Sequence, residues 1–369
     1  MENTRPFTAS IRSIIYLSLF AFLVFFTGEM YLRVTASHIV KKKASKLDDW
    51  IESDPELLVT ETKSGRRLVP KADVVIRHHY LSNRDIDMKI NSLGFRDEEI
   101  SLQRNENEKR VLVLGDSITW GDYLQAEEVF VKRAEYYLNQ KNSRDTFHFI
   151  NAGVGDVGLN EEIAILKDQG LKVKPDIVVV AFYLNDSRPP WGFSDEKGGS
   201  SWIRTHSLLI NKIYSAFKLK QWIQKKGHDR FAWIHAYKRL DWMHSHEDFM
   251  KLVFLAQYDW GAAWQKSSWE EVDKHLLRLK DLAQQHGFKV AIVLFPSAFQ
   301  VYADFLENTP QRVMAKKANE LGFPYLDLLP ILGERADKKL YYDHCHPNVE
   351  ANDIIGKSLA EFIDKTYSL

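Results

Sequence analysis

Cysteine is almost absent from this chain, which has Cys345 alone among 369 residues. One thiol excludes an intrachain disulfide and any zinc site built on several cysteines. An excess of charge of one sign is also missing, because 50 lysine and arginine residues balance 50 aspartate and glutamate residues. A nucleic-acid-binding protein usually shows a basic excess, and neither common glycine-rich nucleotide-binding motif occurs. We therefore expect no nucleic-acid partner and no cofactor.

Long apolar runs are scarce, with one exception near the N-terminus. Residues 13–28 carry no charged side chain, and three further apolar residues follow Glu29. A bilayer span needs about 20 predominantly apolar residues. We therefore expect a transmembrane signal anchor over residues 13–33, after a short tail of residues 1–12. A cleaved signal peptide and a buried core helix are the alternatives.

The charges around this segment bear on its orientation in a membrane. Two arginines precede it, whereas Arg33 and four lysines between residues 41 and 46 follow it. The positive-inside rule would keep the C-terminal side in the cytoplasm. Long following domains are often translocated regardless of such charges. We expect the following domain to lie on the extracytoplasmic side.

Residues 34–100 predict a juxtamembrane linker followed by a small β-rich region. Ile86, Met88 and Ile90 alternate with charged residues. An apolar residue at every second position is typical of a half-buried strand.

From residue 101 to residue 369, short apolar runs alternate with helical stretches. Strands that are buried on both faces read as continuous apolar runs, and their alternation with helices implies a parallel sheet covered on both faces. The sequence therefore predicts a doubly wound, flavodoxin-like sheet of about five strands in three α/β/α layers. The expected strands are 110–115, 147–152, 177–182, 289–295 and 324–328, and the expected helices are about 126–140, 160–170, 270–286, 311–321 and 349–366.

The alternation stops over about residues 187–269, which predicts a mostly helical insertion. This stretch holds eight of the ten tryptophans. Exposed tryptophan rings would stack on sugars, whereas buried ones would form the core of the insertion or lie at a membrane interface. Both interpretations stay open. His244 and His246 lie in the same stretch without a recognisable carboxylate framework, so we expect no metal site.

Polar residues follow three of the predicted strands directly. Ser117 closes a Gly-Asp-Ser turn after the first strand, residues 153–156 follow the second, and Asn185 follows the third. Ligands of such sheets bind at the carboxyl ends of the strands, so we expect these residues to converge. Asp343 and His346 lie three residues apart before the last helix. Together the segments supply the hydroxyl, base and acid that nucleophilic serine catalysis requires.

In this order the four segments resemble the sequence blocks of the SGNH, or GDSL-like, hydrolase superfamily, over roughly residues 90–365. The resemblance implies that Ser117 is the nucleophile, His346 the general base and Asp343 its carboxylate partner. It also implies an oxyanion hole built from the backbone of Ser117, an amide of the second block and the Asn185 side chain.

Two positions depart from the pattern of that superfamily. Asp156 stands where the second block usually has glycine, and Tyr183 stands at the glycine of the third block. Any residue except proline keeps the backbone N–H, but the backbone conformation needed there favours glycine. Both Gly155 and Asp156 are therefore candidates for the oxyanion amide.

The resemblance implies a membrane-anchored serine esterase that hydrolyses an O-acyl ester, expected to be O-acetyl, on a glycan. Its catalytic domain would lie outside the cytoplasm, on the periplasmic side if the protein is bacterial. The alternatives are an O-acyltransferase that modifies an exopolysaccharide or cell-wall glycan, a lipase or thioesterase, and a non-catalytic binding module. Trp120 and Trp191 are the candidate substrate-contacting residues.

Overall fold

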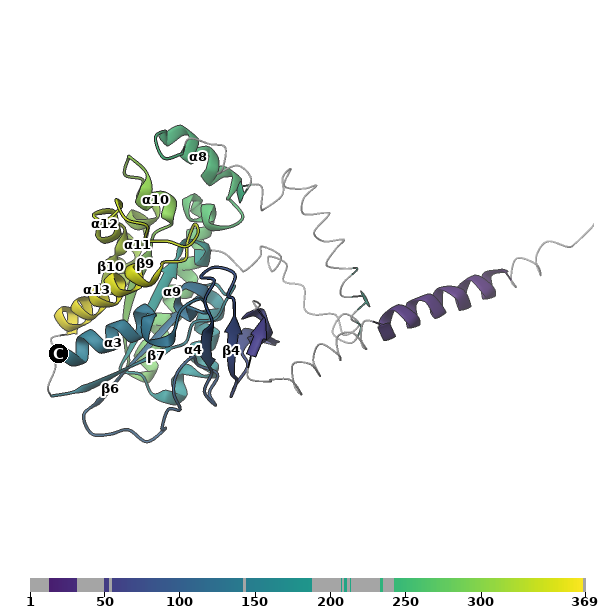
Figure 1. The fold of residues 1–369 in the computed structure, drawn as a ribbon, viewed down its shortest axis with the longest axis horizontal. Coiled ribbons are helices and arrows are strands. Elements are labelled where there is room, and N and C mark those ends of the chain that lie inside the picture. The colour runs from purple at the N-terminus through teal and green to yellow at the C-terminus, as the bar shows by residue number, and fades with distance from the viewer. Residues whose placement is uncertain are drawn as a thin grey trace, which may run out of the picture. The chain divides into compact units, whose positions relative to one another are not determined.

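The computed structural model describes residues 13–31, 50–52, 55–141, 144–187, 207, 209–210, 213, 233–234 and 242–367. The chain divides into two compact units. One comprises residues 1–47 and 196–228, and the other comprises residues 48–195 and 229–369. The N-terminal helix, drawn in purple in Figure 1, belongs to the first unit. All the predicted catalytic residues belong to the second unit.

The larger unit is built on a five-stranded sheet in which every neighbouring pair of strands is parallel. The strand order is β10-β9-β8-β6-β7. Renumbered along the chain this order is 2-1-3-4-5, which is the flavodoxin-like order. The prediction of a doubly wound sheet is therefore confirmed. The strands are β6 (Glu108–Gly115), β7 (Thr146–Asn151), β8 (Ile177–Tyr183), β9 (Lys289–Phe295) and β10 (Tyr325–Asp327).

Burial of the central strands explains their continuous apolar sequences. All seven residues of β8 are buried, as are the last six of β6. Because these two strands have neighbours on both sides and helices on both faces, polar side chains would find no water there.

Helices cover both faces of the sheet. The helices α3 (Phe130–Lys141) and α13 (Val349–Tyr367) lie side by side on one face (Figure 1). They approach closely at Gly356, where an added Cβ would lie 2.3 Å from the Cβ of Arg133. Right-handed crossovers place α4 (Leu159–Asp168), α9 (Lys266–His286) and α11 (Thr309–Leu321) on the other face. Two shorter helices pack against each other: α10 (Ala298–Tyr302), which follows β9, and α12 (Leu328–Gly333), which follows β10.

Residues 50–100 form a small β-rich region within the same unit. Its three-stranded sheet contains β1 (Trp50–Glu52), β4 (Asp73–Arg77) and β5 (Ile86–Lys89), and β2 (Val59–Thr62) pairs with β3 (Gly65–Leu68) as a hairpin. The single-turn helix η1 (Pro55–Leu58) precedes the hairpin. Burial alternates along β5, as its period of two predicts.

Arg96 ties this region to the parallel-sheet core. Its buried guanidinium donates to the carbonyl oxygens of Trp120 at 3.0 Å and Leu124 at 2.6 Å. Those carbonyls belong to the segment that follows β6, so the β-rich region supports the chain beside the candidate nucleophile.

The described tryptophans of the insertion pack inside the unit. Trp233, Trp260 and Trp269 are at most 4% exposed, and the rings of Trp233 and Trp260 meet edge to face at 5.8 Å. Trp260 begins η6 (Trp260–Trp264), which packs against α8 (His246–Leu255), and Trp269 lies in α9. The packing interpretation therefore holds for these three residues. Trp191, Trp202 and Trp222 lie outside the described residues.

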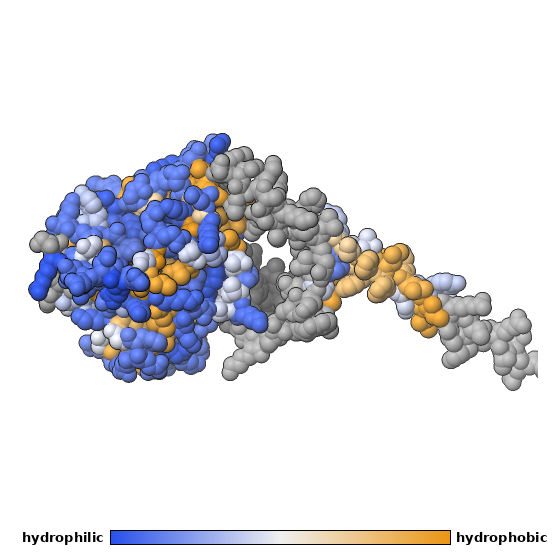
Figure 2. All heavy atoms as spheres, turned by 90° about the horizontal axis from the view of Figure 1, so that it is seen from below, coloured by the Kyte–Doolittle hydropathy of each residue, from blue (hydrophilic) through white to orange (hydrophobic). Residues whose placement is uncertain are grey.

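In the smaller unit, the helix Ser13–Tyr31 is long and apolar enough to cross a membrane. Its large apolar side chains are exposed, and Figure 2 shows apolar residues gathered along it. A helix that is apolar all round needs an apolar environment. A membrane anchor and a signal sequence share these properties.

Candidate active site

Ser117 lies at a sharp turn from β6 into the short helix α2 (Ser117–Trp120). The Asp116 side chain caps α2 by accepting a hydrogen bond from the Ile118 amide at 2.9 Å. Gly115 makes the turn possible, because a Cβ at this position would lie 2.1 Å from the Thr119 hydroxyl. The turn leaves the Ser117 side chain half-buried at the carboxyl end of β6.

Ser117, His346 and Asp343 form a continuous hydrogen-bonded chain. The Ser117 Oγ lies 3.0 Å from His346 Nε2, and His346 Nδ1 lies 2.8 Å from Asp343 Oδ2. The other carboxylate oxygen of Asp343 accepts the backbone amides of Cys345 and His346 at 2.9 and 2.8 Å. The carboxylate accepts a hydrogen bond from Nδ1, which leaves Nε2 as the acceptor that faces the serine.

The charges around His346 tune its basicity. Burial lowers the pKa of His346, but the negative charges of Asp343, Asp122 and Asp116 raise it by more, so the net shift is upward. Burial raises the pKa of Asp343, yet the neighbouring imidazoles and the amide of Cys345 outweigh it and hold that pKa far below the ordinary value. Asp343 is therefore ionised, and His346 is a stronger base than a solvated imidazole.

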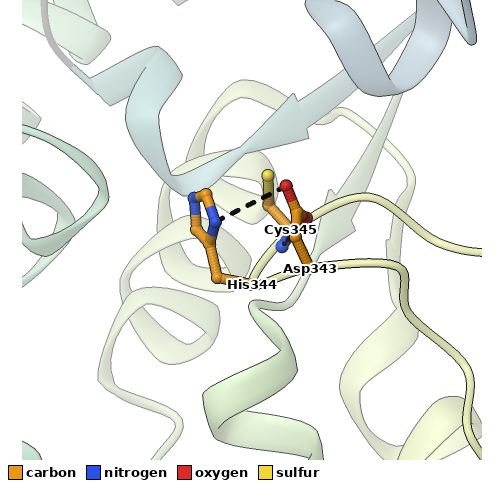
Figure 3. Close-up of side chains that lie close together, drawn as sticks. All are labelled: Asp343, His344 and Cys345. Atoms are coloured by element: carbon orange, nitrogen blue, oxygen red, sulfur yellow. Dashed lines mark hydrogen bonds and ion pairs between the residues drawn. The ribbon is translucent and has the colours of Figure 1, made fainter. Parts of the chain in front are cut away.

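His344 and Cys345 lie within the same loop and bring two further donor atoms close to Asp343. Donor atoms of Asp343, His344 and Cys345 all lie within 4.8 Å of one another, and Figure 3 shows the His344 ring facing the Asp343 carboxylate. Burial raises the pKa of the Cys345 thiol well above its ordinary value, whereas metal ligation needs the thiolate. Because His346 and two amides also bind the same carboxylate, the arrangement suits the hydrogen-bonded chain better than a metal ion.

The loop after β7 packs directly on α2. An added Cβ at Gly153 would lie 2.2 Å from the Trp120 amide nitrogen, and Asn151 donates to the Thr119 carbonyl at 2.7 Å. Gly155 is buried, and Asp156 has a left-handed backbone with a φ of 56°. The structure thus brings both candidate amide donors into a loop that packs on the turn carrying Ser117.

Asn185 approaches the turn from the carboxyl end of β8. It lies in the single-turn helix η4 (Leu184–Ser187), where Asp186 accepts the Tyr183 amide at 2.7 Å and shapes the loop. The Asn185 side chain lowers the pKa of Asp116, the residue beside Ser117, in opposition to burial. Burial raises the pKa of Asp116 to about 6, against the opposing effects of the Ile118 amide and His346.

Three buried carboxyl groups influence one another near the turn that carries Ser117. Asp116, Glu162 and Asp186 are each at most 3% exposed, and their charges act on one another. Burial, reinforced by these neighbours, raises the pKa of Glu162 and of Asp186 well above the ordinary value. Both carboxyl oxygens of Glu162 are buried without a hydrogen-bonding partner among the described residues. Burial therefore favours the neutral form of the Glu162 side chain.

The two predicted substrate-contacting tryptophans have different outcomes. Trp120 is only 1% exposed, and an added Cβ at Gly155 would lie 3.2 Å from its ring. Its ring therefore packs against the loop that follows β7. Contact between Trp120 and substrate stays a prediction. Trp191 lies outside the described residues.

Several residues around the site have no counterpart in the sequence prediction. Tyr123 packs on His346, and Asp122 contacts His79 from the β-rich region at 3.2 Å. Tyr80 lies over His79 with ring centroids 4.6 Å apart and is 63% exposed. The contact between His79 and Asp122 joins segments 43 residues apart in sequence. The local signal for it is the run of two histidines and a tyrosine at 78–80.

Comparisons with known proteins leave the family open. No protein-family model and no curated protein matches the chain. Among solved structures, the acetyl xylan esterase AlAXEase is 15% identical over 70% of this chain and 98% of its own, with a TM-score of 0.40. A variant of Axe2, an acetyl xylan esterase from Geobacillus stearothermophilus, is 14% identical over 69% and 94%, with a TM-score of 0.41. TesA is 15% identical over 70% and 97%, with a TM-score of 0.38. Similarity at TM-scores this low assigns no function to this protein.

Proposed function

We propose that this protein is a serine-dependent ester hydrolase of the SGNH type that works through an acyl-enzyme on Ser117. The observation that supports it most is the series of hydrogen bonds from Ser117 through His346 to Asp343. Ser117 Oγ lies 3.0 Å from His346 Nε2, and His346 Nδ1 lies 2.8 Å from Asp343 Oδ2. Both distances fall within the range for a nucleophile and its base. A purely structural turn would have no need to align a half-buried hydroxyl, an imidazole and an ionised carboxylate in that order.

In the proposed reaction, His346 Nε2 takes the Ser117 proton as Oγ attacks the carbonyl carbon of the ester. The tetrahedral intermediate places negative charge on the former carbonyl oxygen. The Ser117 amide, an amide of Gly155 or Asp156 and the Asn185 side chain are the proposed donors to it. One such donor typically contributes about 2.7–4 kcal/mol. The alcohol then leaves with the proton from His346, and water activated by the same imidazole hydrolyses the acyl-enzyme.

The proposed substrate is an O-acyl ester, with acetyl as the expected group, on a glycan. The resemblance of the four sequence segments supports this class. The exposed ring of Tyr80, next to His79 and the Asp122 carboxylate, adds an aromatic surface of the kind on which sugar rings stack.

We also propose that the helix Ser13–Tyr31 anchors the protein in a membrane, with the catalytic unit outside the cytoplasm. The exposure of its apolar side chains supports an apolar environment. Carbonate extraction followed by mass analysis of the N-terminal peptide would test the anchor. Retention in the membrane fraction with residues 13–31 intact is expected, whereas release together with loss of this peptide would indicate a cleaved signal.

Hydrolysis of p-nitrophenyl acetate by the full chain in detergent tests the reaction. Ser117→Ala should abolish turnover, and Ser267→Ala, which alters an exposed serine of α9, should leave it unchanged. Adding an unacetylated oligosaccharide identifies the acceptor. Acetyl groups appearing on that sugar would identify an acyltransferase, and free acetate alone would identify a hydrolase. Equal turnover by Ser117→Ala and the unaltered protein would refute the proposal.

A further inference from the structure

The backbone of Asp156 is unusual for a residue with a side chain. Its φ of 56° lies in the left-handed region, which glycine adopts without cost and other residues adopt only when the surroundings enforce it. Gly155 precedes it and is confined by the Trp120 ring. The loop therefore holds a carboxylate-bearing residue at a position that suits glycine, next to the turn that carries Ser117.

A carboxylate at this place opposes the chemistry proposed for the site. Negative charge develops on the oxyanion in the transition state, and a like charge nearby destabilises it. The Asp156 charge does reach the turn, because it raises the pKa of Asp116, although burial is the main cause of that shift. An uncompensated Asp156 would therefore slow acylation.

Arg66 supplies the compensating charge from the β-rich region. Its Nη1 lies 3.0 Å from Asp156 Oδ2, and its side chain is only 10% exposed. The same guanidinium also contacts Glu56 of η1, and its Nε lies 3.7 Å from Glu61 Oε1, so three carboxylates share its charge. The Arg66 amide also donates to Glu161 Oε1 at 3.4 Å, in the helix that follows the loop. Arg66 of the hairpin β2–β3 thus contacts the loop at Asp156 and the following helix α4 at Glu161.

We propose that Arg66 is a positioning residue that fixes the oxyanion loop through Asp156 and offsets the Asp156 charge. This inference rests on the proposed function. It means that Arg66, on β3, serves the catalytic site although it lies outside the parallel sheet. Partial burial strengthens the pair, because a weakly solvated guanidinium is less screened by water.

A double-mutant cycle on the full chain in detergent tests the inference. Arg66→Met should lower kcat for p-nitrophenyl acetate by on the order of 10- to 100-fold. Deleting an oxyanion donor outright lowers kcat by more, about 10²–10³-fold. In the Asp156→Gly background, which removes both the charge and the left-handed strain, the same change should alter kcat by less than about 3-fold. Equal effects of Arg66→Met in both backgrounds would overturn the inference.

Arg67 provides the matched control in the same strand. Its guanidinium pairs with Asp168 at 2.8 Å and donates to Ser64 and to the Arg66 carbonyl, rather than to Asp156. Arg67→Met should therefore leave kcat unchanged. If Arg66→Met does not fold, Arg66→Lys keeps the charge but not the fork of donors, and its loss in kcat should stay below about 10-fold. A loss in Arg66→Lys that Asp156→Gly does not reduce would also overturn the inference.

Covalent labelling of Ser117 by a phosphonate separates this inference from the proposed function. An unaltered protein that neither turns over nor is labelled refutes both. A protein that is labelled and active, with no coupling between Arg66 and Asp156, refutes only the inference.

Discussion

The ring of Tyr123 meets the ring of His346 edge to face, with centroids 5.1 Å apart and planes at 71°. Tyr123 is fully buried, and its ring packs on the imidazole. The neighbouring residue, Asp122, is also buried and contacts His79. The base of the proposed reaction is thus held by Asp343 at one nitrogen and flanked by a buried carboxylate from the segment that follows α2.

Asp122→Asn should move the acidic limb of the pH profile of kcat/KM to lower pH. The base works only when His346 is neutral, and the Asp122 charge helps to raise the pKa of His346. Removing that charge lowers the pKa, so the neutral form persists at lower pH. Profiles measured between about pH 5 and 9 would check this, with the exposed Glu127→Gln as control. A limb that stays in place, or moves to higher pH, would contradict the role given to Asp122.

Asn185→Ala should lower kcat by about 10²–10³-fold, because it removes one donor to the oxyanion. Phosphonate labelling of Ser117 should persist, though more slowly, since the nucleophile and base are untouched. KM should change little. A variant that keeps full kcat would show that Asn185 only shapes its loop, as Asp186 does through the Tyr183 amide.

Asp97→Asn should destabilise the folded state by about 3 kcal/mol, the usual cost of breaking one side of a buried ion pair. The Asp97 side chain is 1% exposed and lies 2.9 Å from Lys132 Nζ and 3.4 Å from His148 Nε2. Chemical denaturation near neutral pH would measure the change. Glu98→Gln, which breaks the neighbouring exposed pair with Lys89, should leave the denaturation midpoint near that of the unaltered protein.

The pH dependence of this effect has a defined sign. Burial raises the pKa of Asp97, but His148 and Lys132 lower it by more, so the net shift is downward. A carboxyl group with a lowered pKa contributes stability above its unfolded pKa and loses it as the pH falls. The difference between Asp97→Asn and the unaltered protein should therefore shrink below about pH 4. A difference that grows on acidification would contradict this assignment.

Glu162→Gln should stabilise the protein at about pH 8 and have little effect near about pH 4. The pKa of Glu162 is raised by burial, so folding takes up a proton above the unfolded pKa, and stability falls as the pH rises. One such group costs about 1.4 kcal/mol for each pH unit above its unfolded pKa, until the pH reaches its raised pKa in the folded state. Melting temperatures across this pH range would test the prediction, and a variant that is less stable at the alkaline end would show that Glu162 is ionised and paired.

Much of the fold follows from local sequence pattern. The runs at 177–182 and 289–295 are continuous and apolar because both faces of these strands are covered, and the observed strands match them almost to the residue. The helix predicted at 126–140 begins instead at Phe130. The residues before it form a separate turn, Ala126–Glu128, closed by reciprocal hydrogen bonds between Gln125 and Glu128. A helical pattern does not reveal such a break, because Glu128 also binds the distant Arg84.

The sequence predicts the site residues that lie at strand ends. It does not predict side-chain contacts between segments that are distant in sequence. Ser117, Asn185 and the loop at 153–156 converge because parallel strands end at one edge. The guanidinium of Arg66 reaches Asp156 across 90 residues of sequence, and nothing in the local pattern of the hairpin indicates its partner. Likewise, tryptophan content alone does not show that Trp260 is buried.

The most direct test of the account is the site of covalent modification by a serine-directed phosphonate in the full chain. Peptide mass spectrometry should find the adduct on Ser117, and Asp343→Asn should slow its formation by disturbing the His346 tautomer. Modification of Ser117 at a rate that depends on His346 and Asp343 is the predicted result. An adduct on another residue, or none on Ser117 while the fold is intact, would contradict the claim that this serine is the nucleophile.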